Sequence, residues 1–353
     1  MDSPSPVQHR RAGVAEAARG ARVGIGEEDL GVVKARPLLL LWLLLRAWGP
    51  CPAAARSLGG DDSPRLALWF RALRLHQWAK NLLMFIPMLA AHQWSEPSAL
   101  IKASLAWLVF GLCASGVYVL NDLLDLQDDR RHPLKCRRPF ACRALSLQAG
   151  LRAISLLSVA AFVLAGSWLG PGFSWVLLAY LLLTLAYTLH FKRRMVMDVM
   201  LLALLYTMRL WAGAVVLGIP LSLWLLAFSM FLFLSLALVK RYAELRQLDA
   251  DGWAPGRGYA AADLPMLASL GTSAGYGAVM VLALYVHDER TPLLYRNPQV
   301  IWAICPLLLL WISRVWMLAH RGQMPEDPLL FALRDKPSLG LALFMALALA
   351  LAL

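Results

Sequence analysis

Long apolar runs alternate with short polar segments along most of this chain, a pattern that predicts helices crossing a membrane. A crossing helix needs about 20 mostly apolar residues. Runs of this kind lie near residues 77–95, 99–121, 146–169, 172–190, 195–217, 220–240, 264–286, 299–318 and 338–353. We therefore predict an all-α polytopic membrane protein with about nine transmembrane helices.

The first part of the chain has a different composition. Residues 1–63 are rich in Ala, Arg, Gly and Pro, and their one apolar run, PLLLLWLLL, is too short to span a bilayer. This run resembles the core of a signal peptide. We expect residues 1–63 to form a disordered or signal-like leader and residues 64–353 to form the membrane domain.

The composition narrows the class of protein further. Hydrophobic residues make up 59% of the chain and charged residues only 16%, with a net charge of +12. Soluble domains carry about 25% charged residues. The basic residues lie in short loops, so membrane topology and phospholipid contact explain the charge better than nucleic-acid binding. The five cysteines form no CxxC pair, which argues against a zinc site and favours a reducing compartment.

The loops differ in charge, and this difference predicts the orientation of the chain. Loops after the even-numbered apolar segments hold sixteen Lys and Arg residues, and the opposite loops hold three. Short loops rich in Lys and Arg face the cytoplasm. The loop after the second segment, which begins NDLLDLQDDRRHPLKCRRPF, is therefore predicted to be cytoplasmic.

This loop begins with a row of aspartates. At about 100° per residue, Asp122, Asp125 and Asp129 fall within roughly 60° of one another on a helix, whereas Asp128 lies off this face. Oxygen ligands alone suit Mg²⁺, which usually binds through one or two carboxylates and the phosphates of a substrate. The alternative is a solvated helix end whose acids pair with nearby arginines.

The second half of the loop is basic. His132, Lys135, Arg137 and Arg138 can donate charge-assisted hydrogen bonds to phosphate oxygens, and Pro133 and Pro139 place them on a loop rather than in a helix. Positive-inside topology alone would explain the basic residues, but it does not require aspartates. The two halves together predict a site for a diphosphate leaving group with bound Mg²⁺.

These residues resemble the UbiA superfamily of membrane prenyltransferases. Asn121, Asp122, Asp125 and Asp129 match its first signature, NDxxDxxxD. The stretches RLHQWAKNLLMFIPMLA, DVMLLALLYTMRLWAGA, KRYAELR and DPLLFALRDKPS are similar to the branch that includes decaprenyl-phosphate phosphoribosyltransferase. The resemblance covers about residues 66–340. It implies a nine-helix bundle with a central cavity open to the cytoplasm, transferase activity, and metal binding by the four signature residues.

The chain departs from the superfamily in its second signature, an aspartate pair DxxxD after the sixth helix. Lys240, Arg241 and Glu244 stand there instead, and Asp249 and Asp251 have the wrong spacing. A basic pair suits a donor with an additional phosphate, such as phosphoribosyl pyrophosphate. The first loop departs as well, with Cys136, Phe140, and Cys142 followed by Arg143 where the branch commonly has Arg, another apolar residue and small residues.

Resemblance also implies contacts for four other side chains. It places Asn81, Tyr187 and Lys192 near the metal-bound diphosphate and Lys80 near a phosphate. Lys80 has an alternative role as a snorkelling lysine, and Lys192 as a positive-inside residue.

Two further residues are candidates because of their positions in predicted helices. Arg209 lies about 20 Å into the fifth helix at 1.5 Å per residue. A charge at that depth is costly, so we expect it to bind an anionic substrate group or to pair with an acid. Tyr118 continues the face of Asp122 inward and is predicted to line the cavity.

We predict a Mg²⁺-dependent transferase that moves a phosphoribosyl group from phosphoribosyl pyrophosphate to a polyprenyl phosphate entering from the lipid. Asp122 and Asp125 have catalytic roles in this hypothesis, and Asp125 or Glu244 orients the ribose hydroxyls. One alternative is prenyl transfer from a diphosphate to an aromatic acceptor such as 4-hydroxybenzoate. Another is a transporter or lipid scaffold without chemistry.

Overall fold

The computed structural model describes residues 65–131, 135–248, 252, 257–288, 291–325 and 327–353. The chain divides into two units, Met1–Pro50 and Cys51–Leu353, and all described residues belong to the second. These residues form helices and connecting turns, with no β-strand among them. The all-α class is thus confirmed for this part of the chain. The predicted leader, His132, Pro133, Asp249 and Asp251 lie outside the described residues.

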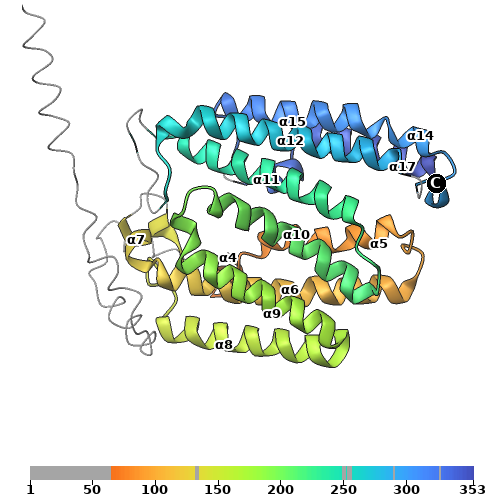
Figure 1. Ribbon diagram of the computed structural model, residues 1–353. Coiled ribbons are helices and arrows are strands. Elements are labelled where there is room, and N and C mark those ends of the chain that lie inside the picture. Colours follow the sequence, from red (N-terminus) through yellow and green to blue (C-terminus); the bar gives the residue numbers. More distant parts are fainter. Residues whose placement is uncertain (1–64, 132–134, 249–251, 253–256, 289–290, 326) are drawn as a thin grey trace, which may run out of the picture. The chain divides into compact units, whose positions relative to one another are not determined.

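Eight long helices make up most of the second unit (Figure 1). They are α6 (Pro97–Leu124), α8 (Leu147–Leu164), α9 (Gly170–Leu189), α10 (Met197–Leu217), α11 (Leu223–Leu245), α12 (Leu264–Val286), α15 (Ile304–His320) and α17 (Lys336–Ala352). Short helical segments connect them: α4 (Arg65–Leu73), η2 (Leu75–Phe85), α5 (Ile86–Ala90), α7 (Leu126–Arg131), η3 (Lys135–Arg137), η4 (Ala165–Leu169), η5 (Phe191–Arg193), η6 (Ala261–Asp263), α13 (Thr291–Leu294), α14 (Pro298–Ile301) and α16 (Pro328–Ala332).

Each of the nine predicted apolar segments coincides with helical structure. Six helical stretches in the described part of the chain are long and apolar enough to cross a membrane. One of them, Leu147–Leu189, contains two of the predicted segments, which meet at Gly170. Gly170 has a φ of 84°, a left-handed conformation that glycine adopts without strain. The figure of about nine membrane crossings stays a prediction.

Local sequence explains where several helices begin and end. The side chains of Ser146 and Asp335 accept hydrogen bonds from backbone amides in the first turns of α8 and α17. Proline occupies the first turn of α6, α12 and α17, where its missing amide hydrogen costs nothing. Gly218, in the left-handed region, ends α10.

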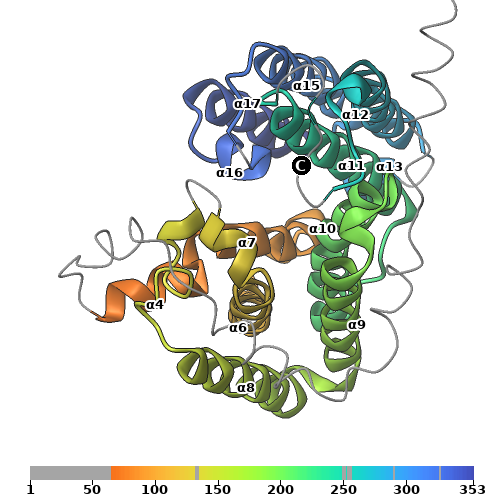
Figure 2. The same ribbon diagram turned by 90° about the vertical axis from the view of Figure 1, so that its left-hand side faces the viewer.

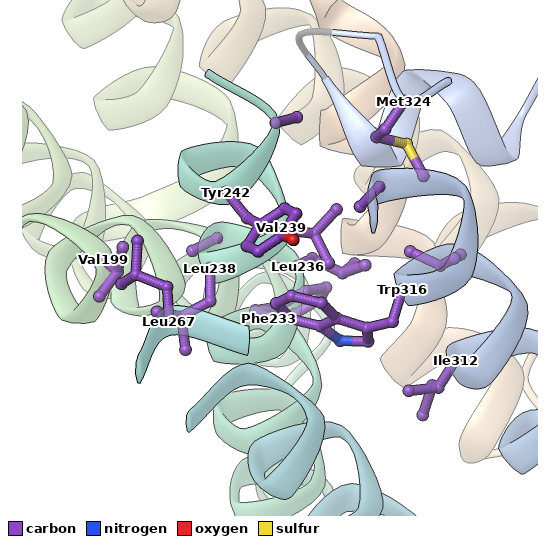
Figure 3. Packing of buried hydrophobic residues seen from close by; sticks show 14 of the residues in the cluster. Val199, Phe233, Leu236, Leu238, Val239, Tyr242, Leu267, Ile312, Trp316 and Met324 are labelled. Carbon is purple, nitrogen blue, oxygen red and sulfur yellow. The ribbon is translucent and has the colours of Figure 1, made fainter. Parts of the chain in front are cut away.

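Buried apolar side chains form two main clusters. In the first, residues of α10, α11, α12 and α15 pack together around Phe233, Leu236 and Trp316 (Figure 3). In the second, residues of α6, α8, α9 and α10 pack around Phe110, Phe173 and Leu177. Figure 2 shows α10 between α9 and α11, and α10 contributes to both clusters. This central position makes α10 the helix that joins the two sets.

The first predicted segment is not the continuous α-helix that its apolar character suggests. Residues 75–85 form a 3₁₀-helix of 11 residues, and five residues of α-helix follow. Arg74, in the left-handed conformation, precedes it. The segment packs closely on α10, because a β-carbon added at Gly213 would lie 2.1 Å from the carbonyl oxygen of Met84. Only glycine allows this approach.

We expect Gly213→Ala to lower the free energy of unfolding by about 1–3 kcal/mol, because η2 would have to move away from α10. Thermal unfolding of the purified protein in detergent would measure this change. Gly340→Ala in α17 is the matched control, because a β-carbon there meets no atom within 4 Å. An unchanged melting temperature for Gly213→Ala would contradict the close contact.

Candidate active site

The aspartates of the first signature lie where α6 passes into α7. α6 ends at Leu124, and Asp125 follows as its C-terminal cap. The backbone amide of Asp129 donates a hydrogen bond to the carbonyl of Asp125 at 2.8 Å, so the helical path nearly continues. Asp122 and Asp129 are only 2% and 3% exposed, and the side chain of Asp125 is half-buried. The predicted acidic face therefore points largely into the protein.

One guanidinium group joins two of these carboxylates. Arg138 Nη1 lies 3.2 Å from Asp122 Oδ1 and 2.7 Å from Asp129 Oδ2. Arg74 also pairs with Asp122. Burial raises the pKa of the Asp129 carboxyl, although Arg138 opposes this shift. The two aspartates thus converge on a shared cation rather than pointing apart.

The third aspartate has a partner from another loop. Lys192 Nζ, in η5, lies 3.0 and 3.2 Å from the two carboxylate oxygens of Asp125. We refer to the three acids and the three bases as the aspartate group. Its members are Asp122, Asp125, Asp129, Arg74, Arg138 and Lys192. With all six side chains ionised, the group is electrically neutral.

The donor set of this region suits a hard divalent cation. No group of three His, Cys, Asp or Glu side chains among the described residues is arranged to hold a metal on its own. Mg²⁺ needs fewer, because it keeps water and uses substrate phosphates as ligands. Asn121 Oδ1 is buried and has no hydrogen-bond partner within the described structure. This free acceptor beside Asp122 fits an oxygen ligand for Mg²⁺.

A second set of charges joins α10 to α11. Arg241 Nε donates to Asp198 Oδ2 at 2.8 Å, and both side chains are completely buried. Arg241 also pairs with Glu244. Arg257 Nη1 lies 2.9 Å from the hydroxyl of Tyr187, which donates to Asp198 Oδ1 at 2.9 Å. We refer to Asp198, Glu244, Arg241 and Arg257 as the Asp198 group, in which two acids balance two bases.

A third set lies between η2, α11 and α16. Lys80 pairs with Asp327, and the ammonium of Lys80 is 5.7 Å from the ring centroid of Tyr206. Lys240 interacts electrostatically with both Lys80 and Asp327. Burial favours the neutral carboxyl of Asp327, but Lys80 and Lys240 outweigh it and hold the pKa of Asp327 below its usual range. We refer to Lys80, Lys240 and Asp327 as the Lys80 group.

Arg209 lies deep between α6, α9 and α10. Its Nε donates to Asn81 Oδ1 at 3.0 Å, and its Nη2 donates to the hydroxyl of Tyr180 at 3.3 Å. Its guanidinium carbon is 5.2 to 5.8 Å from three aromatic ring centroids, those of Phe110, Tyr180 and Tyr206. None of the ion pairs in the described structure includes Arg209. Neutral oxygens and ring faces therefore hold this buried cation.

Two other predicted site residues, Tyr118 and Lys135, lie beside the aspartate group. The Tyr118 ring centroid is 5.2 Å from the guanidinium carbon of Arg74, a member of that group. Lys135, in η3, is exposed, and its charge acts on Asp129.

Four charged residues of these groups were absent from the sequence-based site. The sequence spacing of Arg74 and Asn81 suits one face of an α-helix, which is only a weak indication that Arg74 belongs to the site. Asp198 follows the basic run of residues 192–194 in the first turn of a helix, where acids are common, so its sequence position gave no reason to include it in the site. Asp327 belongs to the stretch DPLLFALRDKPS, which served only to support the family resemblance. Arg257 carries no local signal, since it follows the last residue of α11, Leu245, by twelve positions.

The buried pair of Arg241 and Asp198 generates a stability prediction. Arg241→Met leaves a fully buried carboxylate without its main partner and should cost about 3–5 kcal/mol of unfolding free energy. Adding Asp198→Asn removes that charge and should restore most of the loss. Arg246→Gln is the matched control, because Arg246 is exposed near the same end of α11. Thermal unfolding in detergent measures all three variants, and an equal loss in the single and double variants would contradict the pairing.

Comparison with known proteins places this chain in a family. The profile of the UbiA prenyltransferase family matches residues 82–347. Nodulation protein NoeC of Azorhizobium caulinodans is 40% identical over 284 residues, which cover 79% of this chain and 91% of that protein. Protein y4nM of Sinorhizobium fredii is 35% identical over 80% of this chain, which spans 55% of its length.

A relative with a described activity matches over a shorter region. Decaprenyl-phosphate phosphoribosyltransferase of Mycobacterium tuberculosis is 36% identical over 187 residues, which cover 52% of this chain and 61% of that protein.

The fold also has solved counterparts. A UbiA homolog from Archaeoglobus fulgidus bound to GPP and Mg²⁺ matches with a TM-score of 0.61 and 16% identity, over 81% of this chain and 99% of that one. The same homolog bound to DMAPP and Mg²⁺ matches with a TM-score of 0.61 over 80% and 98%. The likeness to these structures concerns the fold alone. The matched profile covers most of the helical unit, and the six apolar helical stretches in the described part of the chain are those of a multi-pass membrane protein; the chain therefore belongs to the UbiA prenyltransferase family.

Proposed function

We propose that this protein transfers a phosphoribosyl group from phosphoribosyl pyrophosphate to the phosphate of a polyprenyl phosphate in a Mg²⁺-dependent reaction. The observation that carries the proposal is the aspartate group, in which buried carboxylates converge and are balanced by two arginines and a lysine. The similarity to decaprenyl-phosphate phosphoribosyltransferases supports the choice of donor and acceptor.

The balance of charge within the aspartate group suits binding of a metal-bound diphosphate. Mg²⁺, when bound, would stabilise the negative charge that builds on the departing diphosphate. Asn121, Asp122, Asp125 and Asp129 would hold it. Arg74, Arg138 and Lys192 are then free to donate their hydrogen bonds to diphosphate oxygens instead of carboxylates. The site can accept the ligand without leaving a buried charge unpaired.

The transfer itself needs little acid–base chemistry from the protein. A phosphate oxygen of the lipid attacks the anomeric carbon, the bond from this carbon to the diphosphate oxygen breaks, and diphosphate leaves with the bonding electrons. The lipid phosphate is already anionic, so it needs no strong base. Asp125 and Glu244 are the half-exposed carboxylates of the site, with side chains 37% and 40% exposed. They are the candidates to accept hydrogen bonds from the ribose hydroxyls.

The remaining predicted contacts follow the same scheme. We propose that Tyr118, Lys135 and Tyr187 contact the bound donor and that Asn81 reaches the diphosphate with its free amide group, whose Nδ2 is buried and unpartnered in the described structure. The guanidinium of Arg241 pairs with Asp198 and Glu244, which suits a role in positioning the carboxylate of Glu244. Arg209 holds Asn81 in the same manner.

The location of the reaction is proposed from charge asymmetry. The sixteen Lys and Arg residues in one set of loops support a cytoplasmic location for the aspartate group. We propose that this is the bacterial inner membrane and that the lipid-linked pentose phosphate serves cell-envelope assembly.

A second candidate is transfer of a prenyl group from its diphosphate to an aromatic acceptor such as 4-hydroxybenzoate. The fold neighbours bound to GPP or DMAPP with Mg²⁺ favour it. The basic residues Lys240 and Arg241, which stand where the superfamily has a second aspartate pair, count against it.

The test is a transfer assay with purified protein, labelled phosphoribosyl pyrophosphate and a polyprenyl phosphate, with and without Mg²⁺. Asp122→Asn and Asp129→Asn should each lower kcat/KM by about 100-fold or more, because each removes charge from the diphosphate site. Asp128→Asn is the matched control, since Asp128 is exposed on the same short helix. It should leave kcat/KM within about twofold of the unsubstituted protein.

A parallel assay supplies a prenyl diphosphate and 4-hydroxybenzoate. We expect label to enter the lipid phase only from phosphoribosyl pyrophosphate, and only when Mg²⁺ is present. Product from the prenyl assay alone would replace the proposed donor with the second candidate. Equal activity of the Asp122, Asp128 and Asp129 variants would overturn the site.

A further inference from the structure

Val196, just before α10, has a backbone conformation that valine rarely adopts. Its φ is 63° and its ψ is −47°, and the amide of Met197 donates a hydrogen bond to the carbonyl of Met195 at 2.6 Å. This is a γ-turn with positive φ, which is rare and strained. Positive φ is most unfavourable for β-branched residues. Such strain persists only where surrounding contacts hold it, and it is often found at functional sites.

The contacts that hold this turn come from residues 257–259, which we refer to as the Tyr259 segment. The Tyr259 hydroxyl accepts a hydrogen bond from the backbone amide of Val196 at 2.8 Å. A β-carbon added at Gly258 would lie 2.6 Å from the carbonyl oxygen of Arg193, so the two backbones are in contact. The Tyr259 segment therefore packs directly on the turn that precedes α10.

The Tyr259 segment is itself fixed from two sides. The Tyr259 side chain is buried, and the guanidinium carbon of Arg241 in α11 lies 5.7 Å from its ring centroid. Arg241 in turn pairs with Asp198 in the first turn of α10. Arg257 Nη1 donates to the hydroxyl of Tyr187 at 2.9 Å. Because its neighbours are held by α9, α10 and α11, the Tyr259 hydroxyl provides a fixed acceptor for the Val196 amide.

The strained turn follows the lysine that reaches the aspartate group. Lys192, four residues before Val196, lies 3.0 and 3.2 Å from the two carboxylate oxygens of Asp125. The residues between them belong to the same compact turn, in which the carbonyl of Arg194 accepts the amide of Asp198 at 3.1 Å. A change of φ at Val196 would therefore move the backbone of Lys192 relative to Asp125.

We propose that the Tyr259 segment is a positioning element for the transfer reaction. The Tyr259 hydroxyl keeps Val196 in the strained turn, and this turn sets the place of Lys192 at the aspartate group. The inference rests on the proposed function, in which Lys192 transfers its hydrogen bonds from Asp125 to the diphosphate. A lysine has a long, flexible side chain, so a fixed backbone reduces the freedom lost when its ammonium binds. Tyr259 acts through Lys192 and contacts no substrate.

The first test is Tyr259→Phe, which removes the hydroxyl and keeps the ring. It should lower kcat/KM for phosphoribosyl pyrophosphate by about 3- to 10-fold, the effect of one lost hydrogen bond. The KM for polyprenyl phosphate should stay within about twofold, because Lys192 serves the diphosphate. Tyr276→Phe is the matched control, since it loses a hydroxyl contact of 3.0 Å to Ser313 Oγ at an exposed position in α12. An unchanged kcat/KM in Tyr259→Phe would overturn the proposal.

A double-mutant cycle tests whether Tyr259 acts through Lys192. Lys192→Gln should lower kcat/KM by about 10- to 100-fold, the effect of losing a charged hydrogen bond. Adding Tyr259→Phe should lower it no further, because the lysine that Tyr259 positions is already absent. If the two losses multiplied instead, Tyr259 would act independently of Lys192 and the proposal would be wrong.

Val196→Gly tests the role of the strained turn. Glycine adopts positive φ without strain, so the turn no longer depends on the Tyr259 hydroxyl. Val196→Gly should therefore recover most of the activity that Tyr259→Phe loses. A double variant as slow as Tyr259→Phe alone would show that the turn does not transmit the effect, and would overturn the proposal.

A measurement without substrate separates this inference from the proposed function. Acylation of purified full-length protein by an N-hydroxysuccinimide ester, followed by mass spectrometry, reports how readily the reagent reaches each lysine. Tyr259→Phe should raise the acylation rate of Lys192 by about twofold or more, because its ammonium pairs less with Asp125. The rate at Lys102, an exposed lysine in α6, is the internal reference, and Tyr276→Phe should change neither rate.

The two failures are distinguishable. If the unsubstituted protein transfers no phosphoribosyl group, the proposed function fails, yet faster acylation of Lys192 in Tyr259→Phe alone would still establish the positioning. If transfer occurs but neither its kinetics nor the acylation of Lys192 responds to Tyr259→Phe, the positioning alone fails.

Discussion

The structure depends on the pairing of buried acids with bases that come from other elements of the chain. Asp122, Asp129 and Asp198 are almost fully buried, and none could remain ionised there without a cation at contact distance. Their partners lie on the segment before η2, in the loop after α7 and on α11. Each pair therefore fixes one element against another. The ends of the helices at this side of the bundle are held by the same charges that would meet a substrate, so scaffold and site cannot be altered independently.

The sequence was sufficient for the features that depend on local pattern. Apolar runs of about 20 residues predicted the helices, because a helix satisfies its own backbone hydrogen bonds wherever it lies. The periodicity of the NDxxDxxxD stretch predicted that Asp122 and Asp129 would share a face, and both now contact Arg138. The same approach could not show that residues 75–85 form a 3₁₀-helix, since 3₁₀ runs longer than three or four residues are uncommon and an apolar run is expected to be α-helical.

Contacts between distant segments were beyond the reach of sequence patterns. Arg209 was expected to bind an anionic substrate group or to pair with an acid; among the described residues it has no acid partner, and it donates to the neutral side chain of Asn81, 128 residues away. Lys80 was assigned a phosphate contact by resemblance, with a snorkelling lysine as the alternative, and neither interpretation indicated its partner Asp327 near the other end of the chain. Arg241 was predicted to contact the donor, which stays a prediction, and its buried partner Asp198, 43 residues away, was not predicted. In each case the role of the residue depends on which element packs against it. The pattern within a single sequence does not show such long-range contacts.

The helix type of η2 fixes the separation of three interactions along one axis. Arg74, Lys80 and Asn81 stand at or within this segment and reach the aspartate group, the Lys80 group and Arg209, respectively. A 3₁₀-helix rises about 2.0 Å per residue and an α-helix about 1.5 Å, so 11 residues span about 22 Å in one form and about 16 Å in the other. Rewinding η2 as an α-helix would shorten it by about one α-helical turn. The rise per residue of η2 therefore sets the distances between these three interactions. If the segment were α-helical, at least one of these side chains would no longer reach its partner.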